Sequence, residues 1–271
     1  MPELPEVETV MRGLAPLLLS RRLLWVEARR GDLRWPLPEG LGPRLAGARV
    51  TALGRRGKYG LIHTDRREVL ILHLGMSGRI RLDPPALGPH DHVVLATETG
   101  ARLVVHDPRR FGAIDLVGAS DLDRHRWLAH LGPEPLDPAL APDHLARAAA
   151  GRRVAVKALL MDQRVLAGIG NIYASEALFR AGIAPGRACR RISAVRFIRL
   201  QQALGEVLTE SIAAGGSSLR DHAQISGALG DYQLHLRVYG RAGLPCPSCG
   251  APVRRSRIGG RSSFHCPRCQ R

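Results

Sequence analysis

Residues 50–82 read VTALGRRGKYGLIHTDRREVLILHLGMSGRIRL and contain four short β-like runs, separated by turn residues, at 50–53, 59–63, 69–74 and 79–82. Similar runs lie on either side, at 23–28, 92–97, 102–106 and 113–117. Gly, Pro and Asp punctuate all of them. Short strands at this spacing are typical of an antiparallel sandwich or barrel. We therefore predict an N-terminal antiparallel β-sandwich.

The first residues predict a helix that precedes the sandwich. Pro5 suits the first helical position, and Glu6 and Glu8 suit the positive end of the helix dipole. The apolar residues have the spacing of a buried helical stripe: Val7, Val10, Met11 and Leu14. Pro2 and Glu3 are therefore expected just before a helix that is anchored on a core.

The second half of the chain changes character. Residues 132–144, GPEPLDPALAPDH, carry four prolines and are typical of a linker. Helical patterns follow, including 154–162, 171–181 and 193–213. The fold class is thus α+β and multidomain, with flanking helices on the sandwich. The predicted parts are an N-terminal domain at 1–131, the linker at 132–144, a helical domain at 145–233 and a small terminal module at 234–271.

Composition limits the classes of function. The 271 residues suffice for two domains, and the formal net charge of +16 favours a polyanionic partner, since neutralised phosphates release counterions. A solvated basic surface is the alternative. All but two of the 40 basic residues are arginines, the exceptions being Lys58 and Lys157. The sequence has no uninterrupted apolar stretch of about 18 residues, so it does not predict a membrane-spanning helix. The acidic start lacks a signal sequence, so we expect a cytoplasmic protein.

Four cysteines near the end form two CxxC pairs: Cys246, Cys249, Cys266 and Cys269. Four thiolates suit one tetrahedral Zn²⁺ ion, and a site with four protein ligands is structural. Two disulfides or a redox CxxC pair are the alternatives, and both suit a cytoplasmic chain poorly. Arginines lie between and beyond the pairs, with no acidic residue from 246 onward. This favours a zinc ribbon that binds DNA backbone over one that binds protein.

Gly168-Ile169-Gly170-Asn171 runs directly into a helical pattern. We expect Asn171 to be the N-cap, and a helix N-terminus with free N–H groups attracts an anion. Ordinary helix capping explains the same residues equally well. Lys157 lies on the preceding predicted helix. Together, Lys157 and Asn171 are typical of two helices joined by a turn that binds a phosphate.

Removal of Met1 would expose the secondary amine of Pro2. An α-amino group has a pKa near ~8, so a useful fraction is unprotonated at neutral pH and can attack an electrophilic sugar carbon. Glu3 beside it can supply a proton. From these residues alone, an ordinary frayed terminus explains Met-Pro-Glu at least as well.

Several ordered motifs together resemble the formamidopyrimidine-DNA glycosylase family along essentially the whole chain. The motifs are MPELPEVET at the start, RRGKY at 55–59, HLGMSG at 73–78, HDPRRFG at 106–112, LGPEPL at 131–136, LLMDQRVLAGIGNIYASEALF at 159–179, GGSSLRD at 215–221, VYGRAGLPCPSCG at 238–250 and RSSFHCPRCQ at 261–270. The resemblance implies a β-sandwich domain, a helix-two-turns-helix domain and a C-terminal β-ribbon zinc finger with one structural Zn²⁺. It also implies a monomer that binds duplex DNA with oxidised bases or abasic sites in a cleft between domains.

The same resemblance implies a bifunctional glycosylase and AP lyase of base-excision repair that removes oxidised purines. Pro2 would form a Schiff base with C1′ of an everted nucleotide, Glu3 would be the acid, and Lys58 would assist the β,δ-elimination. Met76, Arg109 and Phe111 would fill the void left by the everted base, although a methionine also often fills a core. The implied DNA contacts further include His92, Arg110, Lys157, Asn171 and Arg261.

Residues 215–232 resemble the family's lesion-capping loop. The implied lesion contacts are Ser217, Ser218, Leu219, Arg220 and Asp221. His222 stands where many relatives place an aromatic residue, so the loop departs from the family pattern at this position.

Other functions remain open. The sister family, endonuclease VIII, acts on oxidised pyrimidines. Its members typically begin with PEGPE, whereas this chain has Leu4 in the position of the glycine. A non-catalytic binder of damaged DNA is a rival from another class, against which Pro2, Glu3 and Lys58 weigh. A transcription-factor-like zinc ribbon would leave residues 1–230 unexplained.

Overall fold

The computed structural model describes residues 1–217 and 230–271. The chain divides into two compact units. The N-terminal unit comprises Met1–Ala129 and Ala214–Asp231, and the C-terminal unit comprises His130–Ala213 and Tyr232–Arg271. Among the described residues no helix is long and apolar enough to cross a membrane.

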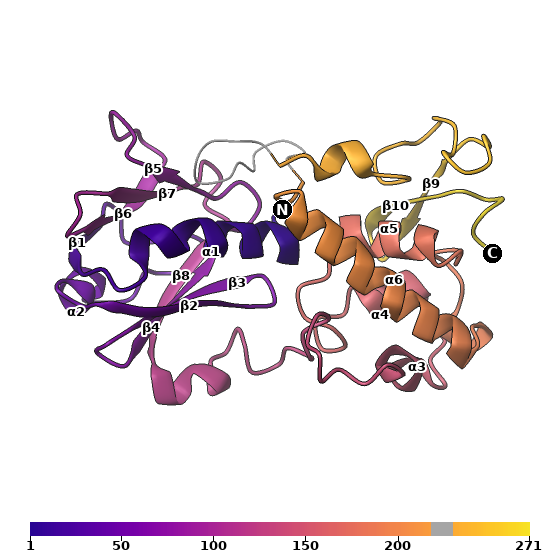
Figure 1. The fold of residues 1–271 in the computed structure, drawn as a ribbon, viewed down its shortest axis with the longest axis horizontal. Coiled ribbons are helices and arrows are strands. Elements are labelled where there is room, and N and C mark those ends of the chain that lie inside the picture. The colour runs from indigo at the N-terminus through magenta and orange to yellow at the C-terminus, as the bar shows by residue number, and fades with distance from the viewer. Residues whose placement is uncertain (218–229) are drawn as a thin grey trace. The chain divides into compact units, whose positions relative to one another are not determined.

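Two four-stranded antiparallel sheets form the N-terminal unit (Figure 1). One sheet has the order β1-β6-β7-β5, with strands β1 (Leu23–Ala28), β6 (Asp91–Thr97), β7 (Arg102–His106) and β5 (Arg79–Leu82). The other has the order β2-β3-β4-β8, with strands β2 (Val50–Arg56), β3 (Tyr59–Thr64), β4 (Glu68–His73) and β8 (Ala113–Gly118). The predicted antiparallel strands are confirmed.

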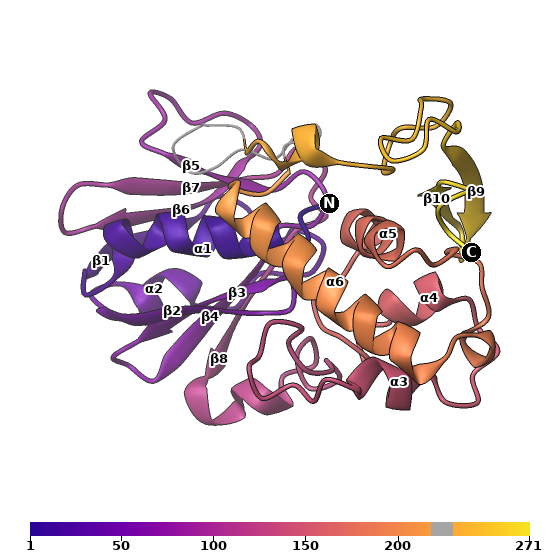
Figure 2. The same ribbon diagram turned by 45° about the vertical axis from the view of Figure 1, so that its right-hand side comes forward.

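The core of this unit contains apolar side chains from both sheets and from helix α1 (Leu4–Leu18). β6 is buried at all seven positions, which requires cover on both of its faces. Helix α1 packs against β2 and β3, with β6 and β7 on its other side (Figure 2). Val7, Val10 and Leu14 are its buried stripe, as the helical spacing predicted. The short helix α2 (Leu41–Leu45) was not predicted, because Gly42 and Pro43 hide any helical period.

Helices dominate the C-terminal unit: α3 (His144–Ala149), α4 (Val156–Leu160), α5 (Asn171–Arg180) and α6 (Ala194–Ala213). Helix α6 packs against α3 and α5. A two-stranded ribbon, β9 (Arg254–Ile258) and β10 (Arg261–His265), lies near the C-terminus. Short 3-10 turns complete the described elements at Ala119–Arg124, Cys189–Arg191 and Tyr232–His235.

Candidate active site and nucleic-acid interface

The start of the chain is held inside the N-terminal unit. Pro2 is buried, and Glu3 and Glu6 are 3% and 1% exposed. The Glu3 N–H donates to Glu6 Oε2 at 2.8 Å, one half of a capping box at the start of α1. Glu6 Oε1 accepts from the Ser217 N–H at 2.8 Å and from Ser217 Oγ at 3.0 Å. The terminus is therefore rigid and is tied to the segment that precedes residues 218–229.

Burial lowers the pKa of the Met1 amine, which begins the chain, below its ordinary value. The nearby charges of Lys58 and Arg109 lower this pKa further, while Glu3 and Glu6 oppose them. Lys58 is itself only 9% exposed and follows Gly57, whose φ of +57° makes the tight turn between β2 and β3. The fold thus brings the terminal amine near a buried carboxyl group and a lysine, in surroundings that favour its unprotonated form. Such a set can carry out nucleophilic attack with proton transfer.

Two loops present large apolar side chains to solvent. Met76 is 41% exposed and Phe111 is 46% exposed. The guanidinium of Arg109 lies 5.8 Å from the centre of the Phe111 ring, and Arg109 is also exposed. The alternative that Met76 fills the core is wrong. Exposed apolar side chains in such a group mark a contact surface.

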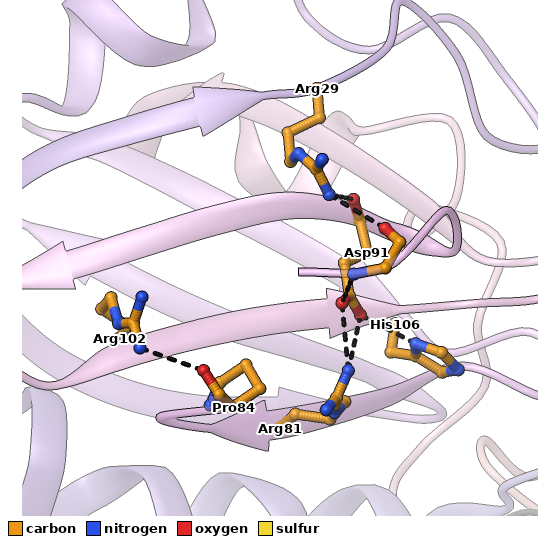
Figure 3. Close-up of polar contacts among 7 residues, drawn as sticks. Arg29, Arg81, Pro84, Asp91, Arg102 and His106 are labelled. Carbon is orange, nitrogen blue, oxygen red and sulfur yellow. Dashed lines mark hydrogen bonds and ion pairs between the residues drawn. The ribbon is translucent and has the colours of Figure 1, made fainter. Parts of the chain in front are cut away.

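Buried polar groups brace the strands that lead into these loops (Figure 3). The Asp91 carboxylate accepts from Arg81 at 3.0 Å, from His106 Nδ1 at 2.8 Å and from the Gly88 N–H at 2.7 Å. Burial alone would raise the pKa of Asp91, but these donors hold it below its ordinary value. Arg29 donates to the Asp91 carbonyl oxygen at 3.0 Å. The end of β7 is thereby fixed just before the loop that begins at Asp107.

His92 and Arg110, both predicted to contact DNA, differ in their exposure to solvent. The His92 side chain is 3% exposed, and its Nε2 donates to the carbonyl oxygen of Asp107 at 2.9 Å. Burial lowers the pKa of His92, so the ring is neutral at pH 7. Arg110 is exposed and lies 3.8 Å from the Asp32 carboxylate. Its φ of +54° is unusual for a residue with a side chain and turns the loop sharply.

In the C-terminal unit, α4, α5 and β10 meet at one peptide group. Lys157 Nζ donates to the Ser262 carbonyl oxygen at 3.1 Å and to Ser263 Oγ at 2.7 Å. Asn171 Nδ2 donates to the same Ser262 oxygen at 3.0 Å. Lys157 is only 1% exposed, so its ammonium group faces the inside of this unit rather than its surface. Arg261, at the start of β10, is exposed.

The N-terminus of α5 differs from the expectation in one detail. Gly170 is the N-cap and Asn171 is the first helical residue, so the prediction of Asn171 as the N-cap is wrong. The Gln163 side chain holds the preceding turn instead: its Nε2 donates to the Ile169 carbonyl oxygen at 2.7 Å, and its Oε1 accepts from the Gly168 N–H at 2.9 Å. The Asn171 amide is therefore free of capping and reaches β10.

The four predicted cysteine ligands converge. Their sulfur atoms all lie within 4.8 Å of one another, and none of them forms a disulfide. Cys246 Sγ and Cys269 Sγ are 3.9 Å apart, and Cys249 Sγ and Cys266 Sγ are 3.5 Å apart. Zn–S bonds of about 2.3 Å in a tetrahedron require sulfur separations of about 3.8 Å. The residues fit one Zn²⁺ ion with four protein ligands, and the disulfide alternative is wrong for this structure.

Family models match the chain in three consecutive segments. These are the formamidopyrimidine-DNA glycosylase N-terminal domain at residues 1–114, the formamidopyrimidine-DNA glycosylase H2TH domain at 131–223 and the zinc finger found in FPG and IleRS at 243–271. The chain belongs to the formamidopyrimidine-DNA glycosylase family. The expected family, the β-sandwich with a helix-two-turns-helix domain and the structural zinc finger are thus confirmed.

Members of this family are similar to the chain over its whole length. The formamidopyrimidine-DNA glycosylases of Rhizorhabdus wittichii and Novosphingobium aromaticivorans are 54% and 55% identical to it, with all of each chain covered. The crystal structure of MutM (Fpg) from Thermus thermophilus matches with a TM-score of 0.89 at 43% identity, covering 99% of this chain and 98% of that one. The Lactococcus lactis Fpg complex with DNA containing an abasic site matches with a TM-score of 0.90 at 30% identity, covering 99% of both.

Sequence reasoning missed the contacts of three buried acids, which join segments that lie far apart in the chain or on different loops. Glu6 joins the chain start to Ser217, and Asp107 joins the two exposed loops. Glu176, on α5, accepts the backbone N–H groups of Arg237, Val238 and Tyr239 at 2.8–3.0 Å. An acid inside an otherwise apolar helical pattern was the available signal for Glu176. Of the predicted lesion-loop residues, Ser217 is described, and Ser218, Leu219, Arg220 and Asp221 lie outside the described residues.

Proposed function

We propose that this chain is a bifunctional DNA glycosylase/AP lyase that excises oxidised purines from duplex DNA in base-excision repair. The observation that carries the proposal is the chain start, where Pro2 and Glu3 are both buried and the charge of Lys58 acts on the terminal amine. Similarity to the Lactococcus lactis Fpg complex with Fapy-dG-containing DNA, at 31% identity and a TM-score of 0.89, supports the substrate class.

In the proposed reaction, removal of Met1 frees the Pro2 nitrogen. This nitrogen bonds to C1′ as the bond between C1′ and the damaged base breaks, and the departing base takes up a proton. Glu3 protonates the ring oxygen, which opens the sugar and leaves an iminium at C1′. The iminium is an electron sink, so loss of a C2′ proton expels the 3′ phosphate, and a second elimination expels the 5′ phosphate. Lys58 assists these eliminations.

Met76, Arg109 and Phe111 are proposed to occupy the space left by the everted nucleotide. Unstacking a base costs a few kcal/mol, and apolar side chains in the gap offset that loss. The exposure of Met76 and Phe111 and the contact between Arg109 and Phe111 support this role. The guanidinium would hydrogen-bond the orphaned partner base.

The other predicted residues complete the proposed contact with DNA. Exposed Arg110 and Arg261 are suited to phosphate, and half-buried Asn171 would lie close to the backbone of the DNA. Buried His92 and Lys157 would hold the segments that carry these contacts. Ser217, Ser218, Leu219, Arg220 and Asp221 would contact the lesion. The Zn²⁺ ion would keep the arginine-rich ribbon folded. We also propose a cytosolic monomer, divided functionally at 1–131, 132–144, 145–233 and 234–271. Its bacterial relatives support the cytosolic location, and the three consecutive family models support an N-terminal, a helical and a zinc-finger part.

The test is borohydride trapping on a duplex with one 8-oxoguanine opposite cytosine, with intact-mass analysis of the protein. We expect a covalent adduct that maps to Pro2 in protein that lacks Met1. Protein that retains Met1 is the matched control and should give none. Absence of an adduct from Met1-free protein, on this duplex and on an abasic one, would overturn the proposal. Faster trapping on an oxidised pyrimidine would overturn the substrate class alone.

A further inference from the structure

One buried carboxylate fastens the two loops that carry Met76 and Phe111. Asp107 is 1% exposed. Its Oδ1 accepts from Ser77 Oγ at 2.7 Å, and its Oδ2 accepts from the Gly112 N–H at 2.7 Å. Ser77 directly follows Met76, and Gly112 directly follows Phe111. The carboxylate therefore holds the residue next to each exposed apolar side chain.

The backbones of the two loops also interlock. Gly75 has a φ of +62°, and a Cβ atom there would lie 2.3 Å from the Phe111 carbonyl carbon and 2.4 Å from the Gly112 nitrogen. Only glycine permits this approach. The Gly78 N–H closes the first loop by donating to the Leu74 carbonyl oxygen at 2.9 Å. The two loops are thus in direct contact, and Asp107 lies beside that contact.

Asp107 is itself firmly held. Its N–H donates to the His90 carbonyl oxygen at 2.9 Å, and its own carbonyl oxygen accepts from His92 Nε2 at 2.9 Å. Asp107 follows His106, whose Nδ1 contacts Asp91 (Figure 3). The carboxylate is anchored to the sheet and reaches out to both loops, so it can transmit the rigidity of the sheet to them.

We propose that Asp107 is a positioning residue for base eversion, which holds Met76 and Phe111 as a single preorganised wedge. The proposal rests on the proposed function of those two side chains. Inserting the wedge into the DNA gains contact free energy but costs the conformational entropy of ordering its two loops. Loops that are already ordered before insertion lose less entropy, so more of the contact free energy stabilises the gap. Asp107→Asn removes the charge that strengthens both hydrogen bonds and leaves one acceptor oxygen. Its NH₂ group either faces the Gly112 N–H, which breaks that tie, or faces Ser77, where it donates to Oγ and reverses the hydrogen bond. In either orientation, Asp107→Asn weakens the ties that the carboxylate makes.

The experiment is a double-mutant cycle of Asp107→Asn with Phe111→Ala, read as single-turnover excision of 8-oxoguanine from duplex DNA. We expect Asp107→Asn to slow excision by about tenfold in the wild-type background and by no more than about twofold in the Phe111→Ala background, because both changes disable the same wedge. Ser77→Ala removes only one tie and should show the same non-additivity with a smaller effect. Fluorescence of 2-aminopurine beside the lesion should report less unstacking in Asp107→Asn.

Thr97→Val is the control, since Thr97 is also fully buried and its hydroxyl contacts Thr99 and Ala101 at the end of β6 that lies away from Asp91. Its effect should be additive with Phe111→Ala. The inference would be overturned if Asp107→Asn and Ser77→Ala each had an effect that is additive with that of Phe111→Ala. Excision by the wild-type protein would leave the proposed function standing in that case. Failure of the wild-type protein to excise any lesion would instead overturn the proposed function.

Discussion

Arg261 and Lys157 provide the most discriminating test of the DNA-binding surface. Both are basic and both approach β10, but Arg261 is exposed and Lys157 is 1% exposed, with its Nζ bonded to Ser262 and Ser263. Arg261→Ala should therefore change the salt dependence of DNA binding. Lys157→Met keeps the length of the side chain but removes its ammonium group, and should change stability instead.

The magnitudes follow from the contacts. One phosphate contact contributes about 0.9 to the slope of log affinity against log salt, so a fourfold rise in salt should weaken the wild-type protein about 3.5-fold more than Arg261→Ala. Hydrogen bonds from a charged donor contribute about 1.5–3 kcal/mol each, partly offset by the penalty for burying the charge. A net loss of about 2 kcal/mol for Lys157→Met would lower Tm by about 5–10 °C in a unit of this size.

Fluorescence anisotropy with abasic-site duplex from 50 to 200 mM NaCl, together with thermal unfolding, measures both quantities. Arg12→Ala is the control, because it removes the same charge from an exposed arginine that pairs with Glu8 on α1. Its slope should equal that of the wild-type protein. A reduced slope in Lys157→Met at unchanged Tm would refute this reasoning, since it would mean that the lysine leaves its buried partners to reach a phosphate.

Three further outcomes are expected. Glu3→Gln should bind lesion duplex with wild-type affinity but excise the base about 10²–10⁴-fold more slowly, because the proposed acid is gone; near-normal excision in a gel assay would exclude that role. Lys58→Gln removes a positive charge that lowers the pKa of the Met1 amine, and we expect this charge to act in the same way on the Pro2 amine once Met1 is removed, so that the pKa of Pro2 should rise and the acidic limb of the trapping rate should move to higher pH. An unmoved limb would count against the electrostatic account. Removal of zinc by a chelator should abolish DNA binding measured by anisotropy while the N-terminal unit keeps its β-type circular dichroism, and unchanged affinity in metal-free protein would show that the finger does not contribute.

Local patterns in the sequence were sufficient for much of this protein. The predicted limits of β1, β5 and β7 coincide with the observed strands, because short apolar runs bounded by turn residues are signals that act over a few neighbours. The four zinc ligands could also be predicted, since two CxxC pairs need only a short ribbon to bring four thiolates together.

Tertiary structure alone decided which polar side chains face inward. Glu6 and Ser217 are 211 residues apart, and Lys157 and Ser263 are 106 apart, yet each pair is hydrogen-bonded. No local period indicates that a lysine is buried or that Asp107 bridges two loops, because those contacts depend on how distant segments pack. A buried charge is stable only where such packing supplies its partners. The sequence by itself therefore determined the elements, the family resemblance and the metal ligands, whereas the packing of the folded units decided which acids and bases act on one another.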